Sequence, residues 1–153
     1  MSRRRQHKFK REKDSLFPFI ILRKDGRKMF QGKKVYICSP LTAPSKEEIK
    51  ENMLLARQYM KHIEEDYHGR AFAPHGYLPE LFNDHIPEER ALVLELGLQI
   101  LYFCDYLVIC GDIISSGMRN EIQIAQKLGI KIYQLTWNGE RGLICEYAMK
   151  VSI

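Results

Sequence analysis

A short apolar run that passes through a small-residue turn into a helix is the feature that most constrains the fold. Residues 106–110 (Tyr-Leu-Val-Ile-Cys) are typical of a buried strand, a Gly/Ser turn follows, and the helix then runs to about Leu128. Such a unit gathers backbone N–H groups and a partial positive charge at the start of the helix. Glu121 lies in or just after the first helical turn, so one segment predicts both a fold and a chemistry.

Strand and helix patterns alternate along the rest of the chain. Strands are predicted at 34–38, 70–73 and 130–135, a helix capped by Ser45 at 46–65, and a Leu-rich, largely buried helix at 87–103. This order favours right-handed crossovers and a mainly parallel sheet covered on both faces. The expected fold is α/β, a doubly wound sheet of four or five mainly parallel strands in one domain, residues 34–153.

Other segments are less regular. Pro74-His75-Gly76 should break the second strand, residues 77–86 should be irregular with at most one helical turn, and residues 144–151 fit either a strand or a short helix. Residues 15–33 are expected to form a β-hairpin extension whose second strand is Lys28 to Phe30.

The basic character of the chain belongs to its N-terminus. The net charge is +5, yet residues 1–13 hold seven Lys/Arg against one acid, and the chain from Val35 onward is acidic, at −5. Residues 1–14 are expected to be a disordered tail. Non-specific contact with nucleic acid through residues 3–13 and a merely solvated tail both fit this composition.

Several functional classes are disfavoured. No apolar run approaches the ~20 residues of a membrane span, and no signal-peptide core follows the basic start, so a cytoplasmic protein without a membrane partner is expected. Cys38, Cys104, Cys110 and Cys145 fit no zinc spacing and are interpreted as reduced thiols. Neither a dinucleotide fingerprint nor a P-loop is present, and no cofactor is predicted. Asn83-Asp84-His85 are adjacent residues in a loop, which rarely converge on one ion, so no metal is predicted.

Candidate site residues collect where the strands end. In open α/β sheets, ligands bind beyond the carboxyl ends of the strands. Glu121 and His75 are the catalytic candidates, although a helix-start acid and a histidine that bonds its own loop explain them equally simply. The ligand-binding candidates are small or polar residues of the same loops: Ser39, Pro40, Thr42, Gly111, Asp112, Ser115, Ser116, Gly117 and Met118.

Four segments carry a resemblance to a known family. They are Val35-Tyr36-Ile37-Cys38-Ser39-Pro40, Ala73-Pro74-His75, Pro87-Glu88-Glu89-Arg90, and Cys104-Asp105 through Ser116-Gly117-Met118-Arg119-Asn120-Glu121. Together they resemble an uncharacterised domain family, common in phages and mobile elements, that is related to the nucleoside 2-deoxyribosyltransferases. The resemblance covers about residues 34–135.

The resemblance implies a flavodoxin-like fold, several subunits, and cleavage of the bond between a nucleobase and deoxyribose. Glu121 matches the nucleophile of those enzymes, and Ser39 and Pro40 match a loop that contacts the ligand. One feature departs from the family: the second carboxylate of the enzymes falls at about Gly97, and Glu95 is offset by two residues.

Three functions follow as hypotheses. The first is a nucleoside or nucleotide N-glycosidase or deoxyribosyltransferase with Glu121 as nucleophile and His75 assisting. The second is a domain that binds a nucleotide without cleaving it, as a sensor or sponge. The third is a nucleic-acid or protein accessory module that acts through the basic tail. Homo-oligomer formation through the helix at 87–103 is compatible with each.

Overall fold

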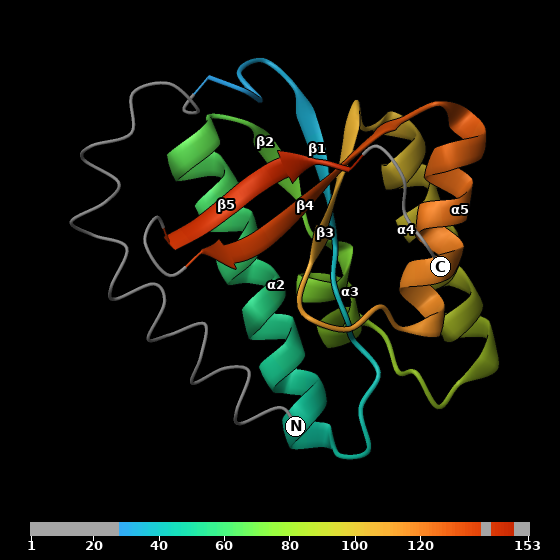
Figure 1. Ribbon diagram of the computed structural model, residues 1–153. Coiled ribbons are helices and arrows are strands. Elements are labelled where there is room, and N and C mark those ends of the chain that lie inside the picture. The colour runs from blue at the N-terminus through green and yellow to red at the C-terminus, as the bar shows by residue number, and fades with distance from the viewer. Residues whose placement is uncertain (1–27, 139–141, 149–153) are drawn as a thin grey trace.

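The computed structural model describes residues 28–138 and 142–148. A five-stranded sheet with the order β2-β1-β3-β4-β5 forms its centre (Figure 1). The strands β2, β1, β3 and β4 pair in parallel with one another, and β5 pairs antiparallel with β4. Their bounds are β1 Lys34–Cys38, β2 Arg70–Phe72, β3 Tyr106–Cys110, β4 Lys131–Asn138 and β5 Gly142–Tyr147. The predicted α/β class with a mainly parallel sheet is confirmed.

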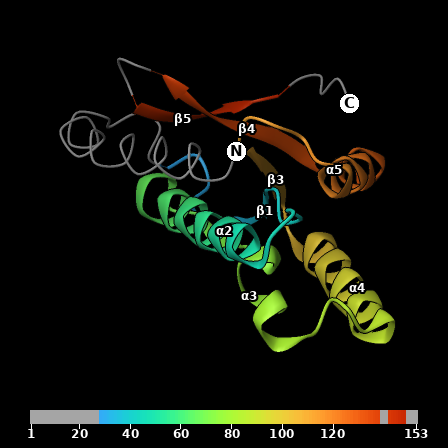
Figure 2. The same cartoon turned by 90° about the horizontal axis from the view of Figure 1, so that it is seen from below.

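Four described helices cover the sheet. Their bounds are α2 Lys46–Tyr67, α3 Pro74–Leu81, α4 Pro87–Phe103 and α5 Ser116–Leu128. Helix α2 packs on one face, α4 and α5 lie on the other, and α3 contacts both α2 and α4 (Figure 2). This arrangement buries both faces of β1 and β3 after their first residues, which is why residues 35–38 and 107–110 are aliphatic, aromatic or cysteine.

The side chains of β1 alternate between two apolar cores. Val35 and Ile37 belong to the core beneath α2, whereas Tyr36 and Cys38 belong to the core beneath α4 and α5. A strand turns successive side chains to opposite faces, so this alternation follows directly from the sequence. Tyr36 is therefore held, almost fully buried, on the face that α5 covers.

Local signals explain the bounds of α2 and α5. The Ser45 side chain accepts a hydrogen bond from the backbone N–H of Glu48 and caps α2, as predicted. Ser115 caps α5 in the same way through Met118 N. Helix α5 ends at Gly129, whose φ of 71° is the left-handed conformation that favours glycine after a helix. These caps fix where each helix begins relative to the strand before it.

Three expectations need correction. The second strand ends at Phe72, before Pro74, as expected, but Pro74 then opens α3, because proline suits the first turn of a helix; residues 77–81, expected to be irregular, are therefore helical. Residues 28–32 form a turn rather than containing the returning strand predicted at 28–30. Helix α4 has the predicted bounds but is not largely buried: Leu101 is its single buried residue. The leucines of α4 project from several sides of the helix, whereas the sheet lies on one side of it. The sheet therefore covers only some of them.

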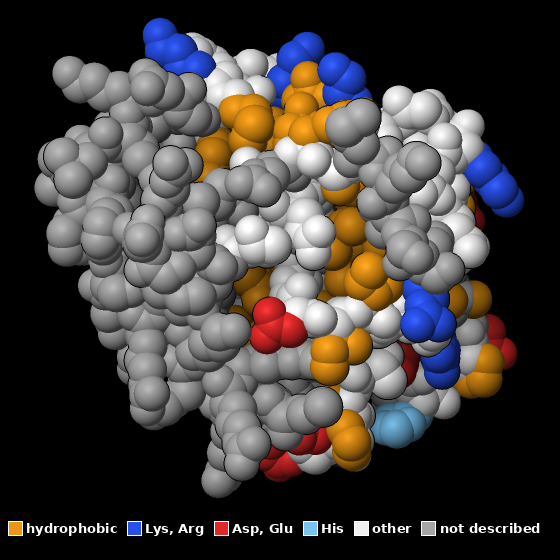
Figure 3. Space-filling view, in the orientation of Figure 1, with side chains coloured by type: hydrophobic (Ala, Val, Ile, Leu, Met, Phe, Trp, Pro, Cys, Tyr) orange, Lys and Arg blue, Asp and Glu red, His pale blue; other side chains and the backbone are white. Residues whose placement is uncertain are grey.

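Other expectations concern the ends of the chain. Residues 144–151 were open between strand and helix, and β5 settles residues 144–147 as strand. The tail at 1–14 and most of the extension at 15–33 lie outside the described residues. In the face seen in Figure 3, hydrophobic side chains gather over the central strands, with Lys and Arg around the rim. Within the described part of the chain, no helix combines the length and apolarity needed to cross a membrane.

Candidate active site

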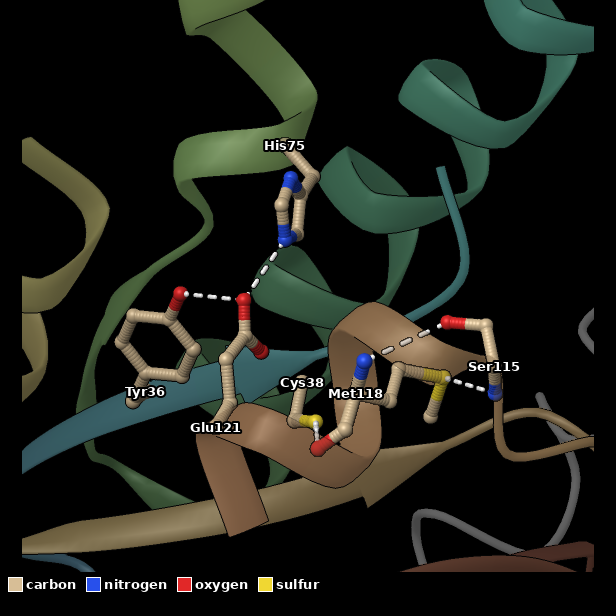
Figure 4. A network of polar contacts seen from close by, with 6 residues as sticks. All are labelled: Tyr36, Cys38, His75, Ser115, Met118 and Glu121. Atoms are coloured by element: carbon tan, nitrogen blue, oxygen red, sulfur yellow. Dashed lines mark hydrogen bonds and ion pairs between the residues drawn. The ribbon is translucent and has the colours of Figure 1, made fainter. Parts of the chain in front are cut away.

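Three elements bring a carboxylate, an imidazole and a phenol together. Glu121, the sixth residue of α5, is only 8% exposed. Its Oε1 lies 3.0 Å from the hydroxyl of Tyr36 on β1 and 2.8 Å from Nε2 of His75, the second residue of α3 (Figure 4). A carboxylate only accepts hydrogen bonds, so the Tyr36 hydroxyl donates to it and His75 presents an N–H to it. The structure thus places Glu121 and His75 in one cluster.

The second oxygen of the Glu121 carboxylate differs from the first in its hydrogen bonding. Glu121 Oε2 is buried and has no hydrogen-bond partner among the described residues. A buried carboxylate oxygen without a partner costs stability, and such groups are uncommon away from functional sites. The two donors on Oε1 orient the carboxylate, while Oε2 is buried beside the Cys38 thiol and lacks a strong donor, which suits a group that reacts or binds through one oxygen once that oxygen is exposed.

The charge of Glu121 acts on the neighbours that share its core. Burial raises the pKa of Tyr36 well above its usual value, and the Glu121 carboxylate raises it further. Burial likewise raises the pKa of the Cys38 thiol, with Glu121 again adding to the effect. Tyr36 therefore stays a neutral phenol that donates a hydrogen bond, and Cys38 stays a thiol rather than a nucleophilic thiolate.

The turn before α5 is partly occupied by its own cap. The Ser115 hydroxyl accepts from Met118 N at 3.3 Å, and the Met118 sulfur lies 3.5 Å from Ser115 N. Met118 itself is buried in the core beneath α4 and α5. Ser116 and Gly117 are exposed, and a Cβ on Gly117 would meet nothing within 4 Å. The open part of this predicted anion cradle is thus its backbone at 116–117, at the positive end of the helix dipole.

The first loop contributes a separate small pocket. Ser39 is 2% exposed, and its hydroxyl has no hydrogen-bond partner among the described residues. It follows the alternation of β1 and lines a pocket on the α2 side with Pro40, Asn52, Tyr59 and Gly111. Ser39 and Pro40 therefore meet Gly111, as expected for neighbouring strand ends, but the Ser39 side chain faces away from the core that holds Glu121.

Two other candidates of these loops face solvent. Thr42 and Asp112 are both exposed. No group of three or more His, Cys, Asp and Glu side chains within the described ranges is arranged to hold a metal ion. All four cysteines lie within the described residues, are buried and form no disulfide.

The position of the missing second acid faces the cluster. A Cβ built on Gly97 of α4 would lie 3.8 Å from the Tyr36 hydroxyl and would meet no other atom within 4 Å. Glu95, two residues earlier, is exposed, and its carboxylate accepts a hydrogen bond from Gln99 at 2.8 Å. The two-residue offset thus turns Glu95 to solvent, and no second carboxylate among the described residues hydrogen-bonds Glu121, whose partners are His75 and Tyr36.

Tyr36 was not among the candidates taken from the sequence. A signal for it existed: Tyr36 interrupts a run of small and aliphatic residues in β1, and a buried tyrosine hydroxyl needs a partner. Strand alternation places it on one face of the sheet. The sequence does not tell which helix covers that face, so the partner could not be named.

Comparisons with known proteins identify the family and the fold. Residues 33–135 match the family described as a domain of unknown function, DUF7768. The chain belongs to this family. No curated protein sequence matches it. The solved structure of a 2-deoxyribosyltransferase from the psychrotolerant bacterium Bacillus psychrosaccharolyticus is similar, with a TM-score of 0.52 and 18% identity. The likeness covers 66% of this chain and 70% of that one, and at this identity it shows the flavodoxin-like fold alone.

Proposed function

We propose that this DUF7768 chain is a nucleoside or nucleotide N-glycosidase or deoxyribosyltransferase with Glu121 as its nucleophile. The observation that carries the proposal is the half-satisfied carboxylate. Two donors hold Glu121 Oε1, and Oε2 is without a partner among the described residues. The fold shared with a 2-deoxyribosyltransferase supports a nucleoside-related ligand.

The proposed reaction runs in two displacements. Glu121 Oε2 is buried in this structure, so ligand entry must expose it. Oε2 then attacks C1′ of the sugar, a C1′–O bond forms, and the C1′–N bond breaks with its electron pair leaving on the base. Protonated His75 gives its proton to that base nitrogen. In the second step water, in a hydrolase, or a nitrogen of a second base, in a transferase, attacks C1′ and gives its proton to the now neutral His75. The C1′–O bond to Glu121 breaks, and its electron pair returns to the carboxylate. Tyr36 and the backbone at 116–117 need no chemical change: the first orients Glu121, and the second binds a sugar hydroxyl or 5′-phosphate.

A ligand screen with product analysis tests this proposal. The purified protein is mixed with 2′-deoxynucleosides, ribonucleosides and their 5′-monophosphates, thermal stabilisation is recorded, and each mixture is analysed for free base by chromatography. Base release by the wild type, with loss of about 10³-fold or more in Glu121→Gln, is expected for a missing nucleophile. Glu95→Gln is the matched control, because that exposed carboxylate lies outside the cluster. Equal release by Glu121→Gln would refute the mechanism.

A second function is favoured by one observation. Gly97 supplies no side chain where the related enzymes are expected to carry a second carboxylate, so a binding domain that does not cleave its nucleotide also fits. In that case ligands would stabilise the wild type and Glu121→Gln alike, and no free base would form. The same screen therefore separates the two functions.

Self-association is a further part of the proposal. Helix α4 exposes large apolar side chains over much of its length, including Leu92, Leu94 and Tyr102. A surface of this kind is typical of a protein interface. Sedimentation velocity at rising protein concentration should show a dimer or larger species. A monomer at all concentrations would contradict it.

Nucleic-acid binding through residues 3–13 is kept as a proposal of its own. It depends on the charge of that segment alone. Retention on DNA or RNA should fall steeply with salt and should disappear when residues 1–14 are deleted. Unchanged retention after the deletion would remove this function.

A further inference from the structure

The helix that carries His75 is weakly stabilised by its own residues. Helix α3 has eight residues, and its N-cap, Ala73, makes no side-chain hydrogen bond. Pro79 lies inside it and has no N–H, so it cannot bond the carbonyl of His75 four residues earlier. Isolated helices of this length are marginal in water. The geometry of the turn around His75 must therefore depend on contacts from outside α3.

One side chain of α2 supplies several such contacts. Arg57 Nε donates to the carbonyl of Gly76 at 2.7 Å, and Arg57 Nη2 donates to Glu80 Oε1 at 2.7 Å. The same guanidinium lies over the Tyr77 ring, with 4.4 Å between Cζ and the ring centroid. Gly76 and Tyr77 are the two residues that directly follow His75. A planar fork with several donors suits this combination of acceptor and ring.

The fit between Arg57 and the turn is close. A Cβ built on Gly76 would lie 3.1 Å from Arg57 Cγ and 3.4 Å from the carbonyl oxygen of Met53. The absence of a side chain at residue 76 thus lets the stem of Arg57 and the backbone of α2 approach the turn. A side chain at residue 76 would require the Arg57 stem or the turn itself to shift by a few tenths of an ångström.

We infer that Arg57 is a positioning residue that fixes the first turn of α3 and so holds His75 against Glu121. The inference rests on the proposed function for its consequence, since His75 is the proton donor there. It does not require catalysis for its test. Arg57 acts from behind α3, through the two residues that follow His75, while the His75 ring lies 2.8 Å from Glu121.

Nuclear magnetic resonance of the His75 ring tests the inference without any ligand. In the wild type, the Nε2 proton shared with Glu121 should give a signal that exchanges slowly with water. Arg57→Gln should abolish or strongly shift this signal. Arg70→Gln is the matched control, since Arg70 also stacks on an aromatic ring, at 5.3 Å from the Phe72 centroid, but at the start of β2. A folded Arg57→Gln protein with an unchanged His75 signal would overturn the inference.

A second variant keeps the test independent of the folding of Arg57→Gln. Gly76→Ala leaves Arg57 in place but should push the turn from α2, so it should shift the same His75 signal. An unchanged signal in Gly76→Ala would also count against the inference. If base release is found, Arg57→Gln should lower kcat more than it raises KM, and Arg57→Lys should recover only part of the loss. If no base is released but the His75 signal still depends on Arg57, the positioning role stands and the proposed function fails.

Discussion

Helices α4 and α5 lie on the same face of the sheet, yet they are built in opposite ways. Helix α5 has 13 residues, and four of them are buried, Glu121 among them. Helix α4 is longer, with 17 residues, and buries Leu101 alone. Charged residues are usually exposed and leucines usually buried, so the buried Glu121 on α5 and the exposed leucines on α4 are both unusual. The difference shows that the apolar face of α5 is covered by this chain, whereas α4 has an apolar surface that the described residues leave exposed.

The contrast extends to the candidate site, because both helices face Tyr36. Helix α5 delivers Glu121, which bonds the Tyr36 hydroxyl. Helix α4 delivers Gly97, which has no side chain to offer to the same hydroxyl. The chain therefore supplies Glu121, the proposed nucleophile, together with its hydrogen-bond partners. At Gly97, where the resemblance places a second acid, it supplies no side chain.

Truncating apolar side chains on the two helices should give the largest difference. Ile122→Ala on α5 and Leu101→Ala on α4 remove fully buried groups, so each should lower the free energy of unfolding by about 2–5 kcal/mol. Leu94→Ala removes a side chain that is 58% exposed and should change it by no more than about 0.5 kcal/mol. Urea unfolding at low protein concentration measures all three. A large loss in Leu94→Ala would show that a partner covers α4 under those conditions.

Tyr36→Phe should weaken turnover without unfolding the protein. It removes one donor from Glu121 Oε1 and leaves His75 in place. Losing a hydrogen bond to a charged group corresponds to about 10–100-fold in kcat. Tyr106→Phe is the control, since Tyr106 packs in the aromatic cluster around Phe30 at the other end of the sheet. Equal turnover in both variants would mean that Tyr36 does not orient the carboxylate.

Gly97→Ala should stabilise α4, and it tests whether the space that Gly97 leaves beside Tyr36 is needed for folding. A Cβ at residue 97 would make only an ordinary contact, at 3.8 Å from the Tyr36 hydroxyl. Alanine in a helix interior is favoured over glycine by roughly 0.5–1 kcal/mol. Thermal unfolding should therefore show a higher midpoint. A lower midpoint would mean that the space beside Tyr36 is needed by the folded protein.

Asp105→Asn should produce the smallest effect, and one that depends on pH. Asp105 follows α4 and accepts a hydrogen bond from Lys34 N at 2.8 Å; this bond, with the Lys34 charge, holds the pKa of Asp105 below its usual value. A lowered pKa stabilises the fold above the unfolded-state value of about 3.9, and that stabilisation is lost as pH falls through the folded-state value. The wild type should thus exceed the variant in stability at pH 7, with the gap closing toward pH 3. A stability difference between wild type and variant that does not change with pH would show that the charge of Asp105 is not its cause.

Much of the fold was predictable, because the spacing of apolar residues and the positions of turn and cap residues indicate the same elements. The strand at 106–110 and the helix start after Ser115 follow from an apolar run and a cap. Helix α3 was missed because Pro74 and Gly76 are breakers in isolation, and contacts from Arg57 across 19 residues outweigh them. The exposure of α4 was missed because Leu-rich composition does not say how much neighbouring surface exists to cover it.

The candidate site was predictable only in part. Strand ends pointed to the segments that follow β2 and β3, and the structure brings His75 of α3 and Glu121 of α5 together there. Ser39 was grouped with them, but strand alternation turns its side chain to the α2 side. Tyr36 could not be paired with Glu121, since the pairing joins residues 85 positions apart. Such pairings depend on how α5 packs on β1, which no local pattern records.

The most direct test of the central claim is a search for a sugar covalently bound to Glu121. The wild-type protein is mixed with the four 2′-deoxynucleosides and their 5′-monophosphates, quenched with acid, digested, and analysed by mass spectrometry. We expect the peptide that contains Glu121 to gain the mass of the deoxyribosyl group, and we expect no gain in Glu121→Gln. Release of free base with no modified peptide, and at the same rate in Glu121→Gln, would contradict the account.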